Sequence, residues 1–549
     1  MKKSILLLLP LLLSVSCNIT TENSQNQSNE SEHTDTSKDE PEVVVLDDNY
    51  RNFYEIFVYS YADSNGDKIG DLNGITSKLD YISSLGYTGI WLTPIFSSNT
   101  YHKYDAVDYF KIDESFGTID DLKNLVSKAH SLNIKVILDG VFNHSSFYNS
   151  WFESALIAKR KILAKQEVTE EERNYASLYT FYDTLEEARN SHKQYYQAGG
   201  NNFYYEANFD RMMPEFNFDS EFTYEKIESV IDYYMSDEIG VDGFRLDAVK
   251  YYYMNDTTKN IKVLNRIAKM IKDNDPKGYA VGECWDAAGT INQYYQSDID
   301  SYFYFPANGQ QGFVCSSCNL EGEYKYTYYD GAKALLDNAD GKIPAPFLNN
   351  HDTGRVSSAG NMGIVKFRLG LLGMLNGATF NYYGDELGMS SANVSGGDYV
   401  DSNYRTHYYW DDETHDMETK DAPNAKVQNE DYPASKTQLA DPDSILNYAK
   451  NINFLRLKQP MIARGELIEN DAEDEANNNN HKKNLLVMKK RYNNKNYKIV
   501  INFSAFYTEN YSIGSYTFED AVTMTSGEKV NNSDGIISLP PHAIAVLAE

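Results

Sequence analysis

Short apolar runs alternate with helical stretches along the chain from about residue 50 to residue 464. This alternation is typical of successive strand–helix units whose strands run parallel. The runs that we interpret as strands are Tyr54–Tyr59, Gly89–Thr93, Lys135–Asp139, Gly243–Asp247, Ala280–Glu283, Phe347–Asn350 and Ala378–Tyr382, with Ser301–Phe305 as a weaker eighth. The pattern favours an α/β fold in which eight strands close into a (β/α)8 TIM barrel over an open sheet.

Two stretches depart from this alternation. Residues 144–217 are too many for the connection between a strand and its helix, so we predict a subdomain inserted after the third strand. After Gly465 the helical units stop, and apolar runs such as Leu485–Met488 and Tyr497–Phe503 are separated by Asn, Gly and Ser clusters. We therefore predict a barrel domain over residues 48–464 and a C-terminal antiparallel β-sandwich domain over residues 465–549.

The N-terminus has the pattern of an export signal. Lys2 and Lys3 precede an apolar run that is too short to span a bilayer, and small residues lead to Cys17. The segment 1–17 resembles a bacterial lipoprotein signal, although the leucine usual three places before the cysteine lies one place earlier, at Leu13. Residues 18–47 have almost no large apolar side chain and predict a flexible tether. We expect an exported protein anchored at the cell surface through Cys17, with full secretion as the alternative.

Charge and cysteine content narrow the classes of partner and fold. The net charge of −30 and the pI near 4.7 disfavour phosphate backbones and anionic lipids, so we expect a monomer that binds no nucleic acid and touches a membrane only through a lipid at Cys17. Cys315 and Cys318 are close in sequence, and no second pair nearby completes a zinc site. We interpret them as a local disulfide, and Cys284 as a small packed side chain.

The predicted strand Gly243–Asp247 has a pair of charged residues at its C-terminal end. Side chains alternate along a strand, so Arg245 and Asp247 face the same way at the end where barrels carry out chemistry. A guanidinium beside a carboxylate favours its ionised form, as a nucleophile requires. The pair alone is also common as a plain salt bridge.

Three further predicted strands end in acidic residues. Glu283 lies near Trp285, whose ring could partly desolvate the carboxyl and raise its pKa, as a general acid requires. His351 and Asp352 follow another strand, where they could hydrogen-bond sugar hydroxyls. Asp139 ends a fourth. So many carboxylates on one rim are costly unless cations or ligand hydroxyls offset them, and coincidence is therefore a poor explanation.

These motifs, in this order, resemble the alpha-amylase family of glycoside hydrolases. The matching segments are Asp139 to His144, Gly243 to Asp247, Glu283, and Asn350-His351-Asp352, with weaker matches at Gly86 to Pro94, Tyr101 to Asp105, Met213 to Asn217 and Gly384 to Glu386. The resemblance implies Asp247 as nucleophile, Glu283 as acid/base and Asp352 as stabiliser of the transition state. The substrate-binding residues that it implies are Tyr101, His102, Tyr104, Asp139, His144, Arg245, Lys250 and His351.

The resemblance further implies a retaining mechanism on α-glucosidic bonds. Ala248 after the nucleophile and Lys250 resemble members that cut α-1,4 links in starch and maltodextrins, whereas Tyr251 replaces a histidine common in alpha-amylases. We expect an endo-acting α-1,4-glucanase. The alternatives are an α-1,6-glucosidase, a cyclomaltodextrinase or neopullulanase-like enzyme, and a glycan-binding protein without catalysis.

A loop after the first strand has the spacing of a metal site. Asp63, Asn65, Asp67 and Asp71 place oxygen side chains mostly at every second residue, which lets a turn wrap a hard cation. In the family a similar loop binds calcium with a backbone carbonyl, here that of Ile69. We expect a structural Ca²⁺ ion, and a plain Asp/Asn/Gly-rich turn is the alternative.

Overall fold

The computed structural model describes residues 43–318, 325–359, 361–391, 400–426, 428–429, 432–469 and 484–549. The predicted signal segment 1–17, with Cys17, and the predicted tether up to residue 42 lie outside the described residues. Among the residues that are described, no helix has the length and apolar character needed to cross a membrane.

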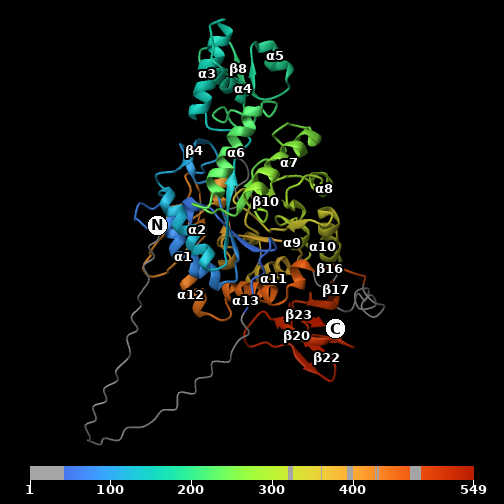
Figure 1. The fold of residues 1–549 in the computed structure, drawn as a ribbon. Coiled ribbons are helices and arrows are strands. Elements are labelled where there is room, and N and C mark those ends of the chain that lie inside the picture. The colour runs from blue at the N-terminus through green and yellow to red at the C-terminus, as the bar shows by residue number, and fades with distance from the viewer. Residues whose placement is uncertain are drawn as a thin grey trace, which may run out of the picture. The chain divides into compact units, whose positions relative to one another are not determined.

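The centre of the fold is a sheet of eight parallel strands (Figure 1). Its strands are β1 (Asn52–Ile56), β2 (Gly89–Leu92), β5 (Lys135–Gly140), β9 (Gly243–Leu246), β10 (Tyr279–Gly282), β11 (Ser301–Phe303), β12 (Ile343–Ala345) and β13 (Thr379–Tyr382). From β1 to β12 each strand pairs with the next in chain order, and β13 pairs with β1, so that β12 and β13 are the two ends of a nearly closed barrel. The predicted (β/α)8 fold is therefore confirmed, including the weak eighth strand at Ser301.

The seventh strand lies earlier than predicted. We expected Phe347–Asn350, but β12 covers Ile343–Ala345 and Phe347 makes only an isolated parallel bridge to Phe380. The reason is the prolines at 344 and 346, which have no amide hydrogen to donate toward β13. Their carbonyls still accept hydrogen bonds from Ala378 N and Phe380 N, at 2.9 and 3.0 Å, and these bonds close the barrel.

Helices cover the outside of the sheet (Figure 1). They are α1 (Leu72–Ser84), α2 (Ile119–Ser131), α6 (Glu221–Met235), α7 (Thr257–Asn274), α8 (Ala288–Tyr294), α9 (Phe313–Ser316), α10 (Lys325–Ala339), α11 (Met362–Gly373), α12 (Ser435–Ala440), α13 (Ile445–Lys458) and α14 (Met461–Arg464). Side-chain caps start several of them: Thr118 and Asp121 form a reciprocal capping box on α2, and Asp71 caps α1 by accepting from Gly74 N at 2.7 Å.

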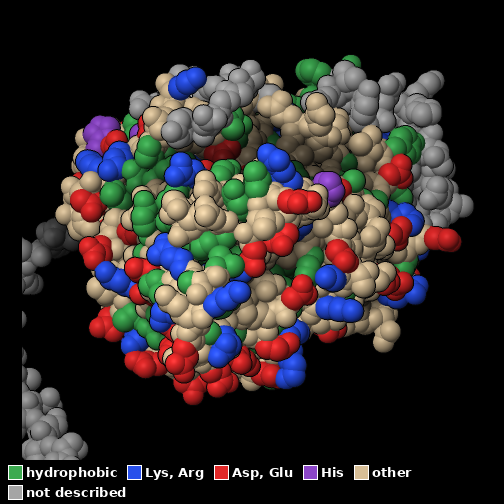
Figure 2. Space-filling view, turned by 90° about the horizontal axis from the view of Figure 1, so that it is seen from above, with side chains coloured by type: hydrophobic (Ala, Val, Ile, Leu, Met, Phe, Trp, Pro, Cys, Tyr) green, Lys and Arg blue, Asp and Glu red, His purple; other side chains and the backbone are tan. Residues whose placement is uncertain are grey.

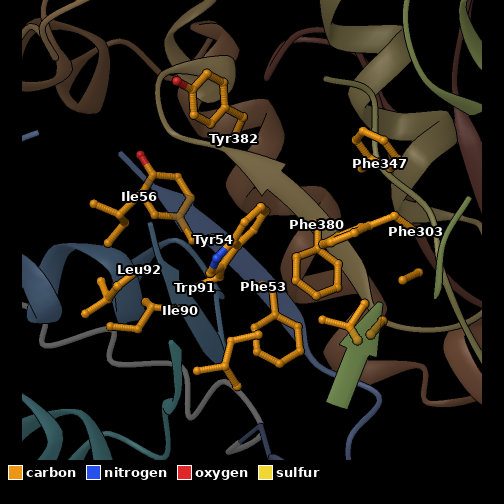
Figure 3. Packing of buried hydrophobic residues seen from close by; sticks show 14 of the residues in the cluster. Phe53, Tyr54, Ile56, Ile90, Trp91, Leu92, Phe303, Phe347, Phe380 and Tyr382 are labelled. Atoms are coloured by element: carbon orange, nitrogen blue, oxygen red, sulfur yellow. The ribbon is translucent and has the colours of Figure 1, made fainter. Parts of the chain in front are cut away.

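Aromatic side chains fill the barrel interior. Phe53 and Phe380 stack with ring centroids 4.6 Å apart, and Phe303 meets Phe380 edge-on at 4.8 Å (Figure 3). Trp91 packs against Phe303 from the opposite strand at 5.4 Å. Rings of this size bury large apolar areas, so the barrel centre is a packed core and the C-terminal ends of the strands hold their side chains in fixed places.

The connection between β5 and β9 contains the predicted insertion. It consists of α3 (Ser150–Leu163), α4 (Glu170–Leu178), α5 (Leu185–Asn190) and the small sheet of β6 (Phe181–Tyr182), β7 (Tyr195–Gln197) and β8 (Tyr204–Glu206), which lie together in Figure 1. A backbone bond from Phe216 N to Asn143 O, at 3.0 Å, ties the end of the insertion to its start. A separate hairpin, β3 (Phe96–Ser98) with β4 (Ala106–Ile112), precedes α2.

Two antiparallel sheets form the C-terminal part, as predicted. One contains β16 (Glu466–Leu467), β17 (Leu485–Tyr492), β18 (Lys495–Asn502), β20 (Thr517–Val522) and β23 (Ile544–Ala548), and the other contains β19 (Glu509–Ser512), β21 (Asn531–Ser533) and β22 (Ile536–Leu539). Side chains from both sheets share one small core, including Val487, Tyr511 and Ile537. The two sheets therefore pack as a sandwich.

The disulfide that we expected is not formed. Cys315 lies in α9 and Cys318 follows its last turn, and both are free thiols, as is the buried Cys284. The backbone continues in a helical turn from Cys315 to Cys318, whose Sγ lies 3.4 Å from Val314 O. A helical turn satisfies these groups locally, so the fold does not require the bond.

Candidate active site

A cavity of about 650 Å³ opens at the C-terminal ends of the barrel strands. Asp247, Glu283 and Asp352 all line it, although they come from three distant parts of the sequence. The remaining lining residues are His102, Tyr104, His144, Phe209, Asp210, Met213, Ala248, Lys250, Tyr251, Trp285, Asp401 and Arg405. The central expectation, that the three carboxyls meet at one mouth of the barrel, agrees with this geometry.

The short strand β9 aims its charged residues at this cavity. Gly243 begins the strand with φ +145°, and a Cβ there would lie 2.0 Å from Tyr279 O, so only glycine fits. Ala248, directly after Asp247, has the left-handed φ of +48°, which costs a non-glycine residue roughly 1–2 kcal/mol. The turn that this conformation makes directs Ala248 N to Glu283 Oε2 at 3.0 Å.

One buried guanidinium holds three carboxyl groups. Arg245 Nη1 lies 2.6 Å from Asp247 Oδ1 and 2.8 Å from Asp139 Oδ1, and its Nη2 lies 3.0 Å from Glu283 Oε1. The Arg245 side chain is fully buried, so water and salt screen these pairs much less than they screen pairs at the surface. The cation offsets the negative charge that burial of these acids would otherwise leave unpaired.

Glu283 is suited to donate a proton. Burial is the main cause that raises its pKa, the charges of Asp247 and Asp352 add to it, and Arg245 opposes it, with a pKa of about 7 as the result. Burial likewise raises the pKa of Asp139 to about 6. A carboxyl that keeps its proton near neutral pH can act as a general acid.

Asp352 is held as a carboxylate. Burial alone would raise its pKa, but His351 and Arg405 more than offset this effect and hold the pKa well below its usual range. The contacts are 3.0 Å from His351 Nε2 to Asp352 Oδ2 and 2.6 Å from Arg405 Nη2 to Asp352 Oδ1. Environments that separate the pKa values of neighbouring acids suit them to different roles, and here the pKa of Glu283 is raised while that of Asp352 is lowered.

The structure places the remaining predicted substrate residues on two levels. His102, Tyr104, His144 and Lys250 line the cavity. Tyr101 is half-buried beside it, and its hydroxyl accepts a bond of 2.9 Å from Arg405 Nη1. Asp139, Arg245 and His351 are almost fully buried beneath the lining residues and contact them, as in the 2.9 Å bond from Tyr104 Oη to Asp139 Oδ2.

The sequence did not show how several lining residues contact their neighbours. Arg405 lies in the chain after β13, and only the fold shows that it pairs with Asp352. Trp285, half exposed, stacks on Phe305 at 5.1 Å, and Phe209 packs against Tyr251 at 4.7 Å, so aromatic rings flank the cavity. Trp285 was expected near Glu283, whereas Phe209 has a weak signal in the sequence because tyrosine and phenylalanine are frequent throughout the chain.

The predicted metal loop folds as a series of side-chain turns. Asp63, Asn65 and Asp67 each accept a hydrogen bond from the amide two residues ahead, at 2.9, 2.9 and 2.7 Å. Asp71 Oδ2 accepts from Ser64 N at 2.8 Å and so joins both ends of the loop. The side-chain atoms that could coordinate a metal are all oxygens, which suits a hard cation. Within the described residues, however, no three His, Cys, Asp or Glu side chains are gathered as metal ligands.

A pair of carboxyl groups with different pKa values on the C-terminal rim of a (β/α)8 barrel is an arrangement that glycoside hydrolases use. Comparison with known proteins narrows the class. The family model described as "Alpha amylase, catalytic domain" matches residues 55–465. The chain is 35% identical over 437 residues to Alpha-amylase 3 of Dictyoglomus thermophilum, covering 77% of this chain and 81% of that protein. It is 29% identical over 351 residues to a 4-alpha-glucanotransferase of Thermotoga neapolitana, covering 61% and 71%.

A solved structure agrees with the fold. Amy13B of Eubacterium rectale superposes with a TM-score of 0.82 at 32% identity, covering 92% of this chain and 97% of that one. The chain therefore belongs to the alpha-amylase family, and it is an enzyme of that family.

Proposed function

We propose that this enzyme is a retaining, endo-acting glycoside hydrolase that cleaves α-1,4-glucosidic bonds in starch, maltodextrins or related α-glucans. The observation that carries the proposal is that Asp247 and Glu283 share the guanidinium of Arg245 while Asp352 lines the same cavity. Two carboxyl groups placed in this way can act on one sugar, one as the nucleophile that takes the sugar from the glycosidic oxygen and the other as the acid/base.

In the proposed reaction Asp247 is the nucleophile. Its carboxylate attacks the anomeric carbon while the bond from that carbon to the glycosidic oxygen breaks, and Glu283 gives its proton to the leaving oxygen. Water then attacks the anomeric carbon of the resulting glycosyl–enzyme ester, the bond from that carbon to the Asp247 oxygen breaks, and the Glu283 carboxylate takes a proton from the water. Asp352, held on both oxygens by cations, stabilises the positive charge that develops on the ring in each step.

We propose that the enzyme prefers α-1,4 over α-1,6 glucosidic bonds. The residues Ala248 and Lys250 and the relative named an alpha-amylase favour α-1,4 bonds, whereas the glucanotransferase relative supports transfer to a second sugar. Rates on maltoheptaose, isomaltose, pullulan and β-cyclodextrin distinguish these activities. We expect maltoheptaose to be cleaved internally with new reducing ends; a preference for isomaltose would reject the α-1,4 assignment, and longer products without net hydrolysis would indicate a transferase. Binding of maltodextrin without any turnover would favour a glycan-binding protein.

The metal and the location of the enzyme complete the proposal. We propose that the loop from Asp63 to Asp71 holds one structural Ca²⁺ ion through oxygen ligands, since its side chains alternate in the way that hard cations require. We further propose export as a monomeric lipoprotein with its lipid on Cys17, from the apolar run and small residues that precede this cysteine. Cys17→Ser should move the protein from the membrane fraction to the medium; an unchanged membrane fraction would contradict lipidation.

A further inference from the structure

The imidazole of His351 lies between two carboxyl groups. Its Nδ1 is 2.6 Å from Glu55 Oε1 and its Nε2 is 3.0 Å from Asp352 Oδ2. The Nε2 atom also lies 2.7 Å from the hydroxyl of Tyr104. Only Asp352 and Tyr104 reach the cavity, because the side chains of Glu55 and His351 are each 1% exposed.

Glu55 is an ionisable residue in an otherwise apolar and aromatic part of β1. Burying a carboxyl group is costly unless its oxygens find donors. Glu55 Oε1 receives two donors from the same residue, the His351 ring and the His351 backbone N–H at 3.3 Å. The side chain does not line the cavity, so any effect of Glu55 on a bound sugar must pass through His351.

Burial raises the pKa of Glu55 and the His351 ring opposes this effect. When both carboxyls are ionised, their contacts require a proton on each ring nitrogen. A neutral imidazole has one N–H and one lone pair, so one of its nitrogens would face a carboxylate oxygen without a proton between them. Burial lowers the pKa of His351, but the charges and hydrogen bonds of Asp352 and Glu55 outweigh burial and raise the pKa to about 10. The imidazolium in turn helps to keep Asp352 ionised.

We propose that Glu55 is a positioning residue for this site: it fixes the His351 ring through Nδ1, so that the Nε2–H is held on Asp352 at the cavity wall. The proposal rests on the proposed function, because Asp352 matters only if the site binds a sugar. Arg405 fixes the other oxygen of Asp352, so the carboxylate is clamped by two cations from different parts of the chain. The charged and titratable groups that face His351 are Glu55, His102, Tyr104, Asp139, Asp352, Asp401 and Arg405.

The substitution Glu55→Gln removes the charge of the side chain while keeping its size and its oxygen acceptor. A glutamine oxygen can still accept from Nδ1–H, but it no longer favours the charged ring, so the pKa of His351 should fall. At about pH 6 we expect kcat/KM within about threefold of wild type, since the ring stays protonated. At about pH 8.5 we expect kcat/KM at least about tenfold below wild type at the same pH, with most of the loss in kcat, because Asp352 serves the transition state. If kcat/KM of Glu55→Gln relative to wild type is the same at both pH values, the proposal is overturned.

Two controls separate positioning from a general loss of packing. Glu386→Gln alters another buried glutamate, which contacts Tyr54 and Tyr408 and not His351. It should change kcat/KM relative to wild type by the same factor at both pH values. Glu55→Asp keeps the charge with a shorter side chain and should restore part of the activity at the higher pH. If Glu55→Asp behaves like Glu55→Gln, the charge of Glu55 is not what matters and the proposal is wrong.

A measurement without substrate tests the same claim. In NMR spectra of protein with isotope-labelled histidine, the His351 signal is assigned by its loss in His351→Gln. We expect a charged ring at about pH 8.5 in wild type and a neutral ring in Glu55→Gln. A neutral ring in wild type would overturn the proposal even if Glu55→Gln fails to fold. The result does not depend on turnover, so an error in the proposed function leaves this test intact.

Discussion

Arg245 Nη1 lies 2.6 Å from Asp247 Oδ1 inside a barrel wall where the arginine side chain has no exposure to solvent. The same guanidinium contacts two further buried acids, Asp139 and Glu283. Its planar fork reaches three carboxyls at fixed angles, which a single ammonium group cannot do. Arg245 therefore offsets part of the negative charge of the site and also sets the relative positions of the acids that we assign to catalysis.

We predict that Arg245→Lys impairs both activity and stability. A lysine leaves at least one buried carboxylate without its partner, and breaking a buried ion pair costs about 3–5 kcal/mol. We expect kcat to fall at least about a hundredfold, since misplaced groups lose their productive geometry. Urea denaturation and release of reducing ends from maltoheptaose measure the two effects. Arg189→Lys, at an exposed position of α5, serves as the control and should change neither; equal behaviour of the two variants would contradict the assigned role.

Glu283→Gln should still bind substrate but should have a much lower kcat. The amide has nearly the shape of the carboxyl group and can still accept from Ala248 N, yet it has no proton to give to the leaving oxygen. General acid catalysis contributes about 10²–10⁴-fold, so we expect kcat to drop by that factor while maltoheptaose binds with a dissociation constant within about threefold. Glu225→Gln on the exposed side of α6 is the matched control. Activity close to wild type in Glu283→Gln would remove this residue from the role.

We predict that kcat/KM falls at alkaline pH, because we assign the protonated form of Glu283 as the active form. Burial raises its pKa to about 7, so the proton is present below that pH and is lost as the pH rises through it. We predict a constant kcat/KM from about pH 5.5 to 6.5 and a fall of about tenfold per pH unit above about 7.5. The sign for stability is the same: the folded protein keeps a proton that the unfolded chain releases near pH 4.5, so this group favours folding less as pH rises between 4.5 and about 7. A profile that stays flat to about pH 9 would exclude Glu283 as the acid.

Much of the fold was predictable because most barrel strands are short apolar runs separated by helical stretches. Asp139, Arg245 and Asp247 could be placed on one rim from strand alternation alone, and the structure pairs β5 with β9 so that Asp139 stands opposite Arg245. The seventh strand was predicted at Phe347–Asn350, after β12, and prolines 344 and 346 give the earlier segment little strand character, although their carbonyls accept the hydrogen bonds from β13.

The parts of the site that could not be predicted depend on contacts between distant segments. Glu55 stands within a predicted strand and gives no local sign that it reaches His351, which lies 296 residues away. Arg405 comes from a connection without regular pattern, and its pairing with Asp352 follows from the path of the backbone. Sequence periodicity indicates which face a residue occupies, but not which side chain will share that face with it.

The loop from Asp63 to Asp71 makes a prediction that is independent of catalysis. An ion that binds only the folded protein stabilises it by about 2.7 kcal/mol at about a hundredfold excess over its dissociation constant. For a chain of this length that corresponds to about 2–3 °C in melting temperature. We therefore expect chelation to lower Tm by this amount, and added Ca²⁺ to restore it.

The variant Asp67→Asn distinguishes a metal site from a plain turn. Its amide oxygen can still accept from Ile69 N, so the turn at Asp67 keeps its hydrogen bond while the loop loses one negative charge. If calcium is bound, Asp67→Asn should need more Ca²⁺ to reach the same Tm, because fewer charged oxygens weaken a hard-cation site. Asp330→Asn, on the exposed face of α10, should respond to chelation as wild type does. If the loop is a plain turn, the melting curve of each of the three proteins should be the same with and without chelator. The side chains of the loop then satisfy its backbone amides without a metal.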